Sequence, residues 1–433
     1  MREDARIGRC SPPRTVVRWS VLRRAIVIVS LLTLGAVVCP TAASADASAP
    51  GVTPTTVTVG QIDDLSAPIP GLFKGAEDGT KAYFAYVNST GGVNGRHLIL
   101  DARDSAFQAG NVTSEAKAIA ATDFAMVGGF EVLDAAEQPV IDATKLPDIA
   151  YALSPSLATD PNVYNAQPSA SAQLGWPTGS YTYFANTFPK AVKSVGELYS
   201  TASAALWKAG DAAAESRGWR FTYTRGVGSG ETSFLSDVIK MKDAGVTLFF
   251  TNSLVPTQFA TLMDEMAQED FHPLVVTGGM YTPALVQTAG SAVDGIYVEQ
   301  QWPMYYGEDA KAVPVVRTYD KWLAKVDPDW KKNTEGQIPG WLNAALFVQA
   351  LRAAGPQPTR EKLVAQLNKI TRFDADGMVA AGNPAGNVPP TCWLLMKIVK
   401  GKYVRTSPSP SSGYICKPSG LYFASGHPWV QTR

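Results

Sequence analysis

The stretch VNSTGGVNGRHLILDARDS, residues 87–105, places three glycines and two asparagines between two apolar runs. Gly91-Gly92 is expected to end a helix, because glycine readily adopts the left-handed backbone that caps helix C termini. Asn94-Gly95 is a typical tight turn. Residues 97–104, HLILDARD, have a strand pattern. The stretch therefore predicts a helix end, a turn and a strand start.

Residues before this stretch extend the pattern to a βαβ unit. TTVTVGQI, residues 55–62, alternates β-branched residues with polar residues and glycine, which favours a strand. Residues 76–88 place apolar side chains near helical spacing. Strand, helix, turn and strand form the start of a βαβ repeat.

Strands and helices continue to alternate along the chain, which predicts parallel sheets covered by helices on both faces. About eleven strands are too many for one sheet, so we expect two doubly wound α/β lobes. Ligands bind such sheets at the carboxyl ends of the strands. Further strands are expected at 124–129, 148–153, 192–198, 221–227, 246–251, 272–278, 295–302 and, as a pair, around 392–401, and helices at 111–120, from about Pro139, 201–217, 231–244, 257–269, 283–289, 313–326, 340–354 and 360–370.

The charge distribution argues against a nucleic-acid partner. The 433 residues carry no net charge, but residues 1–45 hold seven arginines and only two acids. Without them the chain has 31 basic and 36 acidic residues, a net charge of −5. Proteins that bind nucleic acids usually present a basic stripe.

The N-terminal 45 residues resemble a secretory signal. An arginine-rich stretch ends at Arg24, and the apolar run 25–38 is too short to span a bilayer comfortably. Ala43-Ser44-Ala45 has the small-residue pattern of a cleavage site. We therefore expect an exported protein cleaved near Ala45. An uncleaved anchor is the alternative, and Cys39 leaves a lipid anchor open.

Two cysteines, Cys392 and Cys416, remain after cleavage. In an exported chain they are expected to form a disulfide, which would stabilise the fold by roughly 3 kcal/mol. These cysteines and three scattered histidines form no metal-ligand pattern, and no cofactor is expected.

No catalytic signature is present in the sequence. The chain has neither a phosphate-binding G-x-x-x-x-G-K-[ST] motif nor a G-x-S-x-G nucleophile elbow. GVGSG, residues 226–230, lacks the third glycine of a dinucleotide fingerprint. We expect a binding protein rather than an enzyme. A hydrolase would need a nucleophile and a base that the sequence does not reveal.

Several segments, in order, resemble type 1 periplasmic binding proteins, and most of all the branched-chain amino acid (leucine/isoleucine/valine) type that serves ABC importers. The resemblance covers about residues 51–404. The segments that carry it are TVTVGQ (56–61), AYFAYVNSTGGVNGR (82–96), VGG (127–129), ETSFLSDVIKMKDAGVTLFF (231–250) and GWLNAALFVQALRAAG (340–355).

This resemblance implies two lobes that are joined by three crossover hinge strands and close over a ligand. It also implies a monomer that delivers a small-molecule ligand to a membrane permease. The implied boundaries are 51–171 and 303–375 for lobe one, 172–302 and 376–433 for lobe two, and crossovers near 171, 302 and 375.

The sequence departs from the family where amino-acid ligands are held. The segment after the third strand, residues 128–136, has no hydroxyl group, and residues 277–283 have no acidic residue for the ligand ammonium. Ser154 and Ser156 do offer hydroxyl groups after the fourth strand. We therefore expect a ligand that is not a standard α-amino acid, although Glu131 could instead hold a cationic group.

The candidate ligand-binding residues follow the predicted strands and are mostly aromatic or small, as is typical of ligand pockets. Any single aromatic could instead pack between the lobes, and Asp63-Asp64 could be a solvated turn pair rather than ligand contacts. The candidates are Ser66, Phe73, Gly129, Phe130, Glu131, Ser154, Tyr199, Ser253, Met280, Tyr281 and Trp302.

These patterns together predict an extracytoplasmic solute-binding protein of an ABC importer with a small, partly apolar ligand. An exported ligand sensor that acts with a membrane receptor would have the same sequence features, so it remains the alternative.

Overall fold

The computed structural model describes residues 49–66, 72–171, 174–201, 204–332, 336–408, 413–417 and 420–424. The predicted secretory signal, with Cys39 and Ala45, lies outside these residues. No helix within the described ranges is long and apolar enough to cross a membrane.

The first lobe is built on a parallel five-stranded sheet in the order β2-β1-β3-β4-β5. β1 and β2 pair over their whole length, from Thr56 opposite His97 to Asp63 opposite Asp104. The strands are β1 (Thr56–Asp63), β2 (His97–Asp104), β3 (Met126–Val127), β4 (Asp148–Ile149) and β5 (Val163–Tyr164).

The helix end, turn and strand start predicted from residues 87–105 are confirmed. Helix α1 (Leu72–Asn88) ends where predicted, and Gly91, Gly92 and Gly95 all have positive φ. The Asn88 amide closes the unit by hydrogen bonding to both the N–H and the carbonyl of Leu98, each at 2.8 Å.

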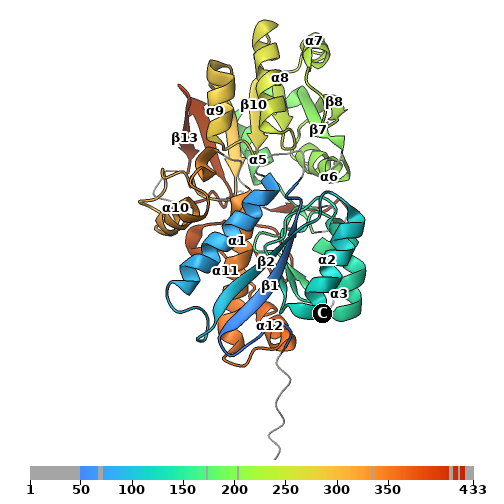
Figure 1. The fold of residues 1–433 in the computed structure, drawn as a ribbon. Coiled ribbons are helices and arrows are strands. Elements are labelled where there is room, and N and C mark those ends of the chain that lie inside the picture. The colour runs from blue at the N-terminus through green and yellow to red at the C-terminus, as the bar shows by residue number, and fades with distance from the viewer. Residues whose placement is uncertain are drawn as a thin grey trace, which may run out of the picture. The chain divides into compact units, whose positions relative to one another are not determined.

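Six helices of seven or more residues in the described ranges belong to this lobe, three of them from the later part of the chain. α1 lies side by side with α11 (Figure 1). Glycines permit this close approach, because a Cβ at Gly79 would collide with the Gln337 carbonyl and one at Gly340 with the Ala76 carbonyl. The other helices are α2 (Ala109–Thr122), α3 (Gln138–Thr144), α10 (Val315–Val326), α11 (Gln337–Ala354) and α12 (Arg360–Leu367).

The second lobe contains a seven-stranded sheet in the order β13-β12-β11-β10-β9-β7-β8. Strands β7 to β11 are parallel, and the late strands β12 and β13 add an antiparallel edge. The strands are β7 (Val195–Ser200), β8 (Phe221–Val227), β9 (Leu248–Thr251), β10 (Leu274–Gly278), β11 (Tyr297–Gln300), β12 (Leu394–Val399) and β13 (Lys402–Ser407).

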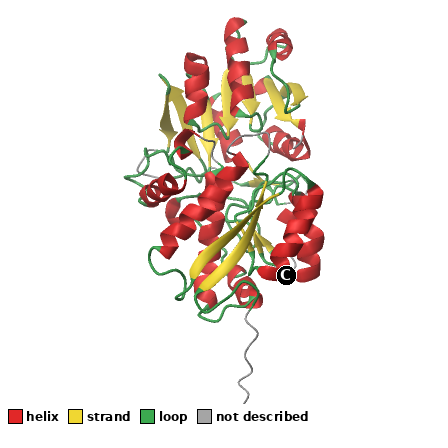
Figure 2. Cartoon of the chain, viewed as in Figure 1, coloured by secondary structure: helices red, strands yellow, loops and turns green. Residues whose placement is uncertain are grey.

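Helices cover both faces of this sheet, as the continuous apolar run of β9 requires (Figure 2). Phe249 belongs to the same core cluster as Phe259 of α8, whereas Leu248 and Phe250 belong to the cluster that contains Tyr181 of α5. The helices are α5 (Gly179–Thr187), α6 (Ala204–Glu215), α7 (Leu235–Asp243), α8 (Pro256–Gln268) and α9 (Pro283–Ala289).

The chain passes between the two sheets three times, which confirms the predicted type 1 arrangement. The crossings follow β5, follow β11 and precede β12. The first and third crossings form isolated bridges, such as Ser171 with Gly175 in the first and Trp393 with Ile415 in the third.

Several local predictions were wrong. The helix predicted at 111–120, with Asn111 expected as its N-cap, is α2, whose N-cap is Gln108; the Asn111 side chain instead donates a hydrogen bond to the Ser105 carbonyl at 3.0 Å. Strand 148–153 is only two residues long. The sequence analysis also missed short elements whose formation depends on tertiary packing, namely β5, α4 (Pro155–Ala158), β6 (Trp176–Pro177), α5 and β14 (Leu421–Tyr422).

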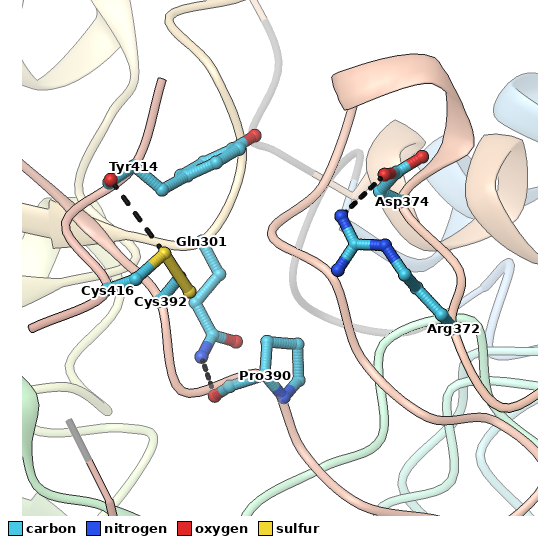
Figure 3. Close-up of a disulfide and its surroundings, with 7 residues drawn as sticks. All are labelled: Gln301, Arg372, Asp374, Pro390, Cys392, Tyr414 and Cys416. Carbon is cyan, nitrogen blue, oxygen red and sulfur yellow. Dashed lines mark hydrogen bonds and ion pairs between the residues drawn. A yellow bond between two sulfur atoms is a disulfide. The ribbon is translucent and has the colours of Figure 1, made fainter. Parts of the chain in front are cut away.

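The predicted disulfide between Cys392 and Cys416 is present (Figure 3). Next to the disulfide, the backbone N–H of Trp393 donates to the Ile415 carbonyl at 3.0 Å, and the backbone N–H of Ile415 donates to the Trp393 carbonyl at 2.6 Å. The disulfide therefore fixes residues 413–417 against the third crossover.

Candidate functional site

A cavity of about 280 Å³ lies at the carboxyl ends of β9, β10 and β11. This edge of a doubly wound sheet is where ligands are expected to bind. These strands and the turns that follow them contribute Asn252, Gly278, Gly279, Glu299 and Gln300.

All three crossovers contribute to the cavity wall. The Gln167 side chain, in the first, donates to the Gln301 side chain, in the second, at 2.8 Å. The Gln301 amide in turn donates to the carbonyl of Pro390, in the third, at 2.8 Å (Figure 3). This chain of hydrogen bonds ties the wall to the segments that would bend in a hinge motion. The crossovers contribute Gln167, Ala170, Gln301, Trp302, Thr391 and Trp393.

The beginning of α5 and the residues before it form another wall. The Trp176 indole N–H donates to the Tyr181 hydroxyl at 2.9 Å, and the indole lies against Gly210 of α6, where a Cβ would come within 2.7 Å of the ring. A larger residue at Gly210 would displace the ring. This wall consists of Trp176, Pro177, Gly179, Ser180 and Tyr181, and Tyr151 completes the lining.

Glu299 is the only charged residue among those that line the cavity, and no lysine, arginine or histidine is among these described residues. Burial raises the pKa of its carboxyl group from 4.5 to about 7, although a hydrogen bond from Ser180 opposes the shift. At neutral pH the Glu299 carboxyl group is therefore close to the midpoint of its titration.

Five buried polar atoms of the lining residues have no hydrogen-bond partner within the described part of the chain. An unpaired buried polar group costs about 1–3 kcal/mol and calls for a partner from outside the protein. Three are acceptors and two are donors: Gln167 Oε1, Glu299 Oε2, Gln300 Oε1, Trp302 Nε1 and Trp393 Nε1.

Residues 56–402 match the sequence pattern of the periplasmic binding protein family. The chain belongs to this family. The predicted resemblance is thereby confirmed, and membership implies an extracytoplasmic location. A search of curated proteins finds no match.

Solved structures with the same fold include ABC transporter binding proteins with different ligands. A fatty acid ABC transporter substrate-binding protein from Thermomonospora curvata is 19% identical, covering 86% of this chain and 95% of that chain with a TM-score of 0.69. A branched-chain amino acid ABC transporter from Thermus thermophilus with bound valine is 16% identical, covering 82% and 96% with a TM-score of 0.68. At these identities the likeness establishes the fold and not the ligand.

Among the predicted ligand-binding residues of this periplasmic binding protein, Trp302 lines the cavity. Gly129 and Glu131 line a second, much smaller cavity of about 10 Å³, and Tyr151 lines both cavities. In the described structure, Phe130 and Phe73 line neither cavity: the Phe130 ring packs with its centre 5.3 Å from that of Tyr151 and 5.1 Å from that of Phe73.

Met280 and Tyr281 lie away from the cavity in a buried aromatic cluster. The Tyr281 ring packs 5.1 Å from Tyr305 and 4.9 Å from Tyr403, and its hydroxyl donates to Glu308 at 2.6 Å. The Tyr403 hydroxyl donates to the Met280 carbonyl at 2.5 Å. This cluster fills the position where the family was expected to place an acidic residue.

The remaining candidates have local structural contacts. Ser66 hydrogen-bonds to Asp104, and Ser154 caps α4 by accepting a hydrogen bond from the Leu157 N–H. Ser253 accepts a hydrogen bond from the Ser200 N–H at 2.8 Å. Tyr199 lies in β7 with its ring beside Gly226. None of these four lines the cavity in the described structure.

Asp63 and Asp64 are not a solvated turn pair, because they are only 1% and 2% exposed. Asp63 accepts a hydrogen bond from the Phe130 N–H at 2.8 Å, and Asp64 accepts one from the Val132 N–H at 2.9 Å. The two carboxyl groups therefore hold the loop that carries Glu131.

Glu131 itself is buried, and its carboxyl oxygens make no close hydrogen bond among the described residues, although the Ser105 hydroxyl is near enough to oppose the rise of its pKa. Burial, with smaller contributions from the charges of Asp64, Asp134 and Asp63, raises its pKa to about 9. A neutral carboxyl group is a poor anchor for a cation. No group of three or more acidic, cysteine or histidine residues in the described ranges is arranged to hold a metal ion.

Most residues of the cavity wall were not predicted from the sequence. Glu299 and Gln300 could have been found from the rule that ligands meet strand carboxyl ends, because they are the last two residues of β11. Trp176, Ser180, Gln167 and Trp393 gave no such signal, because they lie in segments whose position depends on the crossovers.

Proposed function

We propose that this protein is the solute-binding component of an ABC importer and holds a small, partly apolar ligand in the 280 Å³ cavity. The observation that carries the proposal is that all three crossovers and the carboxyl edge of the second sheet line one cavity. A ligand there would contact every segment that has to bend for the lobes to close.

The cavity is also chemically suited to a partly apolar ligand. Five aromatic side chains line it, together with a few polar groups that have no partner among the described residues, which is the usual composition of a small-molecule site. The positions expected to hold a zwitterionic amino acid are occupied by Phe130 after β3 and by the buried Met280 and Tyr281 after β10. We therefore propose a ligand other than leucine, isoleucine or valine.

Thermal-shift and calorimetric screening of residues 46–433 tests this function. Amines, amides, aromatic acids, fatty acids and branched-chain amino acids should be compared. A bound ligand at 100 times its Kd stabilises the native state by about 2.7 kcal/mol, which is readily detected. Binding of none of these classes would contradict the proposal, and micromolar binding of leucine would contradict the proposed ligand class.

A matched pair of tryptophan variants locates the site. Trp302→Ala should weaken binding about tenfold or more, because it removes an aromatic wall. Trp322→Ala is the control, since Trp322 is also partly buried but lies on α10 outside the cavity. Stimulation of a permease ATPase by the loaded protein would favour an importer over the alternative, an exported sensor.

A further inference from the structure

The cavity of the proposed solute-binding protein carries a charge pattern that narrows its ligand class. Its single charged lining residue is the acidic Glu299, and its described lining residues include no cationic side chain. An anionic ligand would therefore meet a carboxyl group without a compensating positive charge, whereas a cation would gain a partner.

Three of the five unpaired polar atoms in the described lining are acceptors, which an ammonium group can satisfy, and the two donors are the uncharged indole N–H groups of Trp302 and Trp393. Gln167 Oε1, Glu299 Oε2 and Gln300 Oε1 are buried acceptors without a partner among the described residues. Their other contacts are already made, because the Gln167 amide donates to Gln301, and the Gln300 amide donates to the Trp302 and Pro303 carbonyls. An ammonium group brings three N–H donors and no acceptor, so it is a suitable partner for acceptors of this kind.

The aromatic side chains add a second reason for a cation. Cations are attracted to the faces of tryptophan and tyrosine rings, and the same rings provide apolar surface for a hydrocarbon group. Five aromatic residues line the cavity together with Glu299: Tyr151, Trp176, Tyr181, Trp302 and Trp393.

We propose that the cavity binds an organic cation, a protonated amine on a small apolar body, whose ammonium group contacts the Glu299 carboxylate. This proposal rests on the proposed solute-binding function and specifies its ligand class. Ser180 has a positioning role, because its hydrogen bond fixes the Glu299 carboxyl group at the start of α5.

No charged or titratable group described on the neighbouring elements supplies the Glu299 carboxyl group with the positive partner that an ammonium ligand would provide. On α5 the neighbour is Tyr181, whose hydroxyl already accepts the Trp176 indole N–H. On β12 the neighbour is Lys397, whose ammonium lies 4.9 Å from the centre of the Tyr297 ring on Glu299's own strand. β10 has no titratable residue, and Glu197 of β7 interacts with Asp211 of α6.

Calorimetry with matched probes at pH 8 tests the ligand class. The phenylethyl, hexyl and 3-methylbutyl skeletons would each be offered as the amine, the carboxylate and the alcohol. We expect at least one amine to bind, and its carboxylate and alcohol to bind about tenfold more weakly or not at all. Equal or tighter binding of the carboxylate or the alcohol, or no binding of any amine, would overturn the proposal.

A variant and a pH series test the role of Glu299. Glu299→Gln should weaken amine binding roughly 30-fold, while Glu197→Gln, which changes a buried carboxyl group outside the cavity, should leave it unchanged. In the wild type, amine affinity should fall as the pH drops from 8 to 5.5, because the Glu299 carboxyl group gains a proton around pH 7. Simple amines remain protonated throughout this range.

The outcomes separate the two proposals. Equal amine affinity of the wild type and Glu299→Gln, or an amine affinity independent of pH, would refute the proposed contact between the ammonium group and Glu299. Binding of acids or alcohols alone would refute the cation while supporting the solute-binding function. Absence of binding by every class in both screens would refute both.

Discussion

The loops after the strands of lobe one and those after the strands of lobe two occupy equivalent places in their sheets, but they differ in how their polar groups are used. In lobe one, Asp63, Asp64 and Asp134 accept hydrogen bonds from the backbone of neighbouring loops. In lobe two, Glu299 and Gln300 keep acceptor oxygens without a partner among the described residues, at the edge of a cavity.

This difference shows that a strand-end position does not by itself identify a ligand-binding residue. The same kind of residue, a buried carboxyl group at the carboxyl end of a parallel strand, holds loops together in one lobe and faces a cavity in the other. The number of internal partners separates Asp63, Asp64 and Asp134 from Glu299, whereas Glu131 of lobe one differs from Glu299 in the volume of the cavity that it lines, about 10 Å³ against 280 Å³. The comparison predicts that lobe-one variants change stability, whereas variants of the cavity wall change binding.

The largest effect is expected for Glu131→Gln at alkaline pH. The pKa of the wild-type Glu131 carboxyl group is raised from 4.5 to about 9. As the pH rises through this range, the unfolded chain loses the proton more readily than the folded chain, so the wild type loses stability relative to the variant by at most about 1.4 kcal/mol per pH unit. Urea unfolding at pH 5, 7 and 9 should show that the variant is more stable than the wild type by an amount that grows with pH. Reduced ligand affinity with no gain in stability would instead make Glu131 a ligand contact.

Removal of the disulfide should have the next largest effect. The double variant Cys392→Ser/Cys416→Ser should lose about 3 kcal/mol of unfolding free energy, because the loop between the two residues is no longer closed. Urea unfolding measures the loss, and wild-type protein treated with a reductant serves as the control. Equal stability of reduced and oxidised wild type would argue against a stabilising disulfide.

Removal of one loop-holding carboxylate should cost somewhat less. Asp134→Ala deprives the Leu153 and Ser154 N–H groups of their acceptor and should destabilise the protein by about 2 kcal/mol. Asp142→Ala, at an exposed position on α3, is the control and should stay within about 0.5 kcal/mol of the wild type. Similar effects of the two variants would contradict the claim that the Asp134 carboxylate stabilises lobe one by holding its loops.

The smallest effect is expected for Ser154→Ala, which removes the N-cap of α4 and should cost about 1 kcal/mol. Thr359→Ala is a matched control, because Thr359 caps α12 in the same way. Both variants should retain the wild-type ligand affinity in calorimetry. A loss of affinity in Ser154→Ala alone would support the original prediction that Ser154 binds the ligand.

The sequence predicted most of the fold because its signals are local. Residues 87–105 contain the glycines, the Asn-Gly turn and the strand, and each of these features depends on a few neighbouring residues. β2, β8 and α9 begin and end at the predicted residues. β5 and α5 were missed because short elements form through contacts with the sheets that they join.

The candidate site was less predictable for the same reason. Trp302 was named from its place after a strand, and it does line the cavity. Tyr281 was named by the same rule, yet its ring is buried against Tyr305 and Tyr403. A strand end fixes the region in which a side chain lies, but not whether that side chain faces a cavity or packs into the core.

The three passages between two sheets were implied by the family resemblance, whereas the sequence by itself determined the alternating strands and helices and the pairing of Cys392 with Cys416. Those features follow from local backbone preferences, periodic apolar residues and the count of cysteines. Only the tertiary structure decided that Gln167, Trp176, Glu299 and Trp393 surround one cavity. Their positions depend on packing between segments more than two hundred residues apart, and no local pattern encodes such packing.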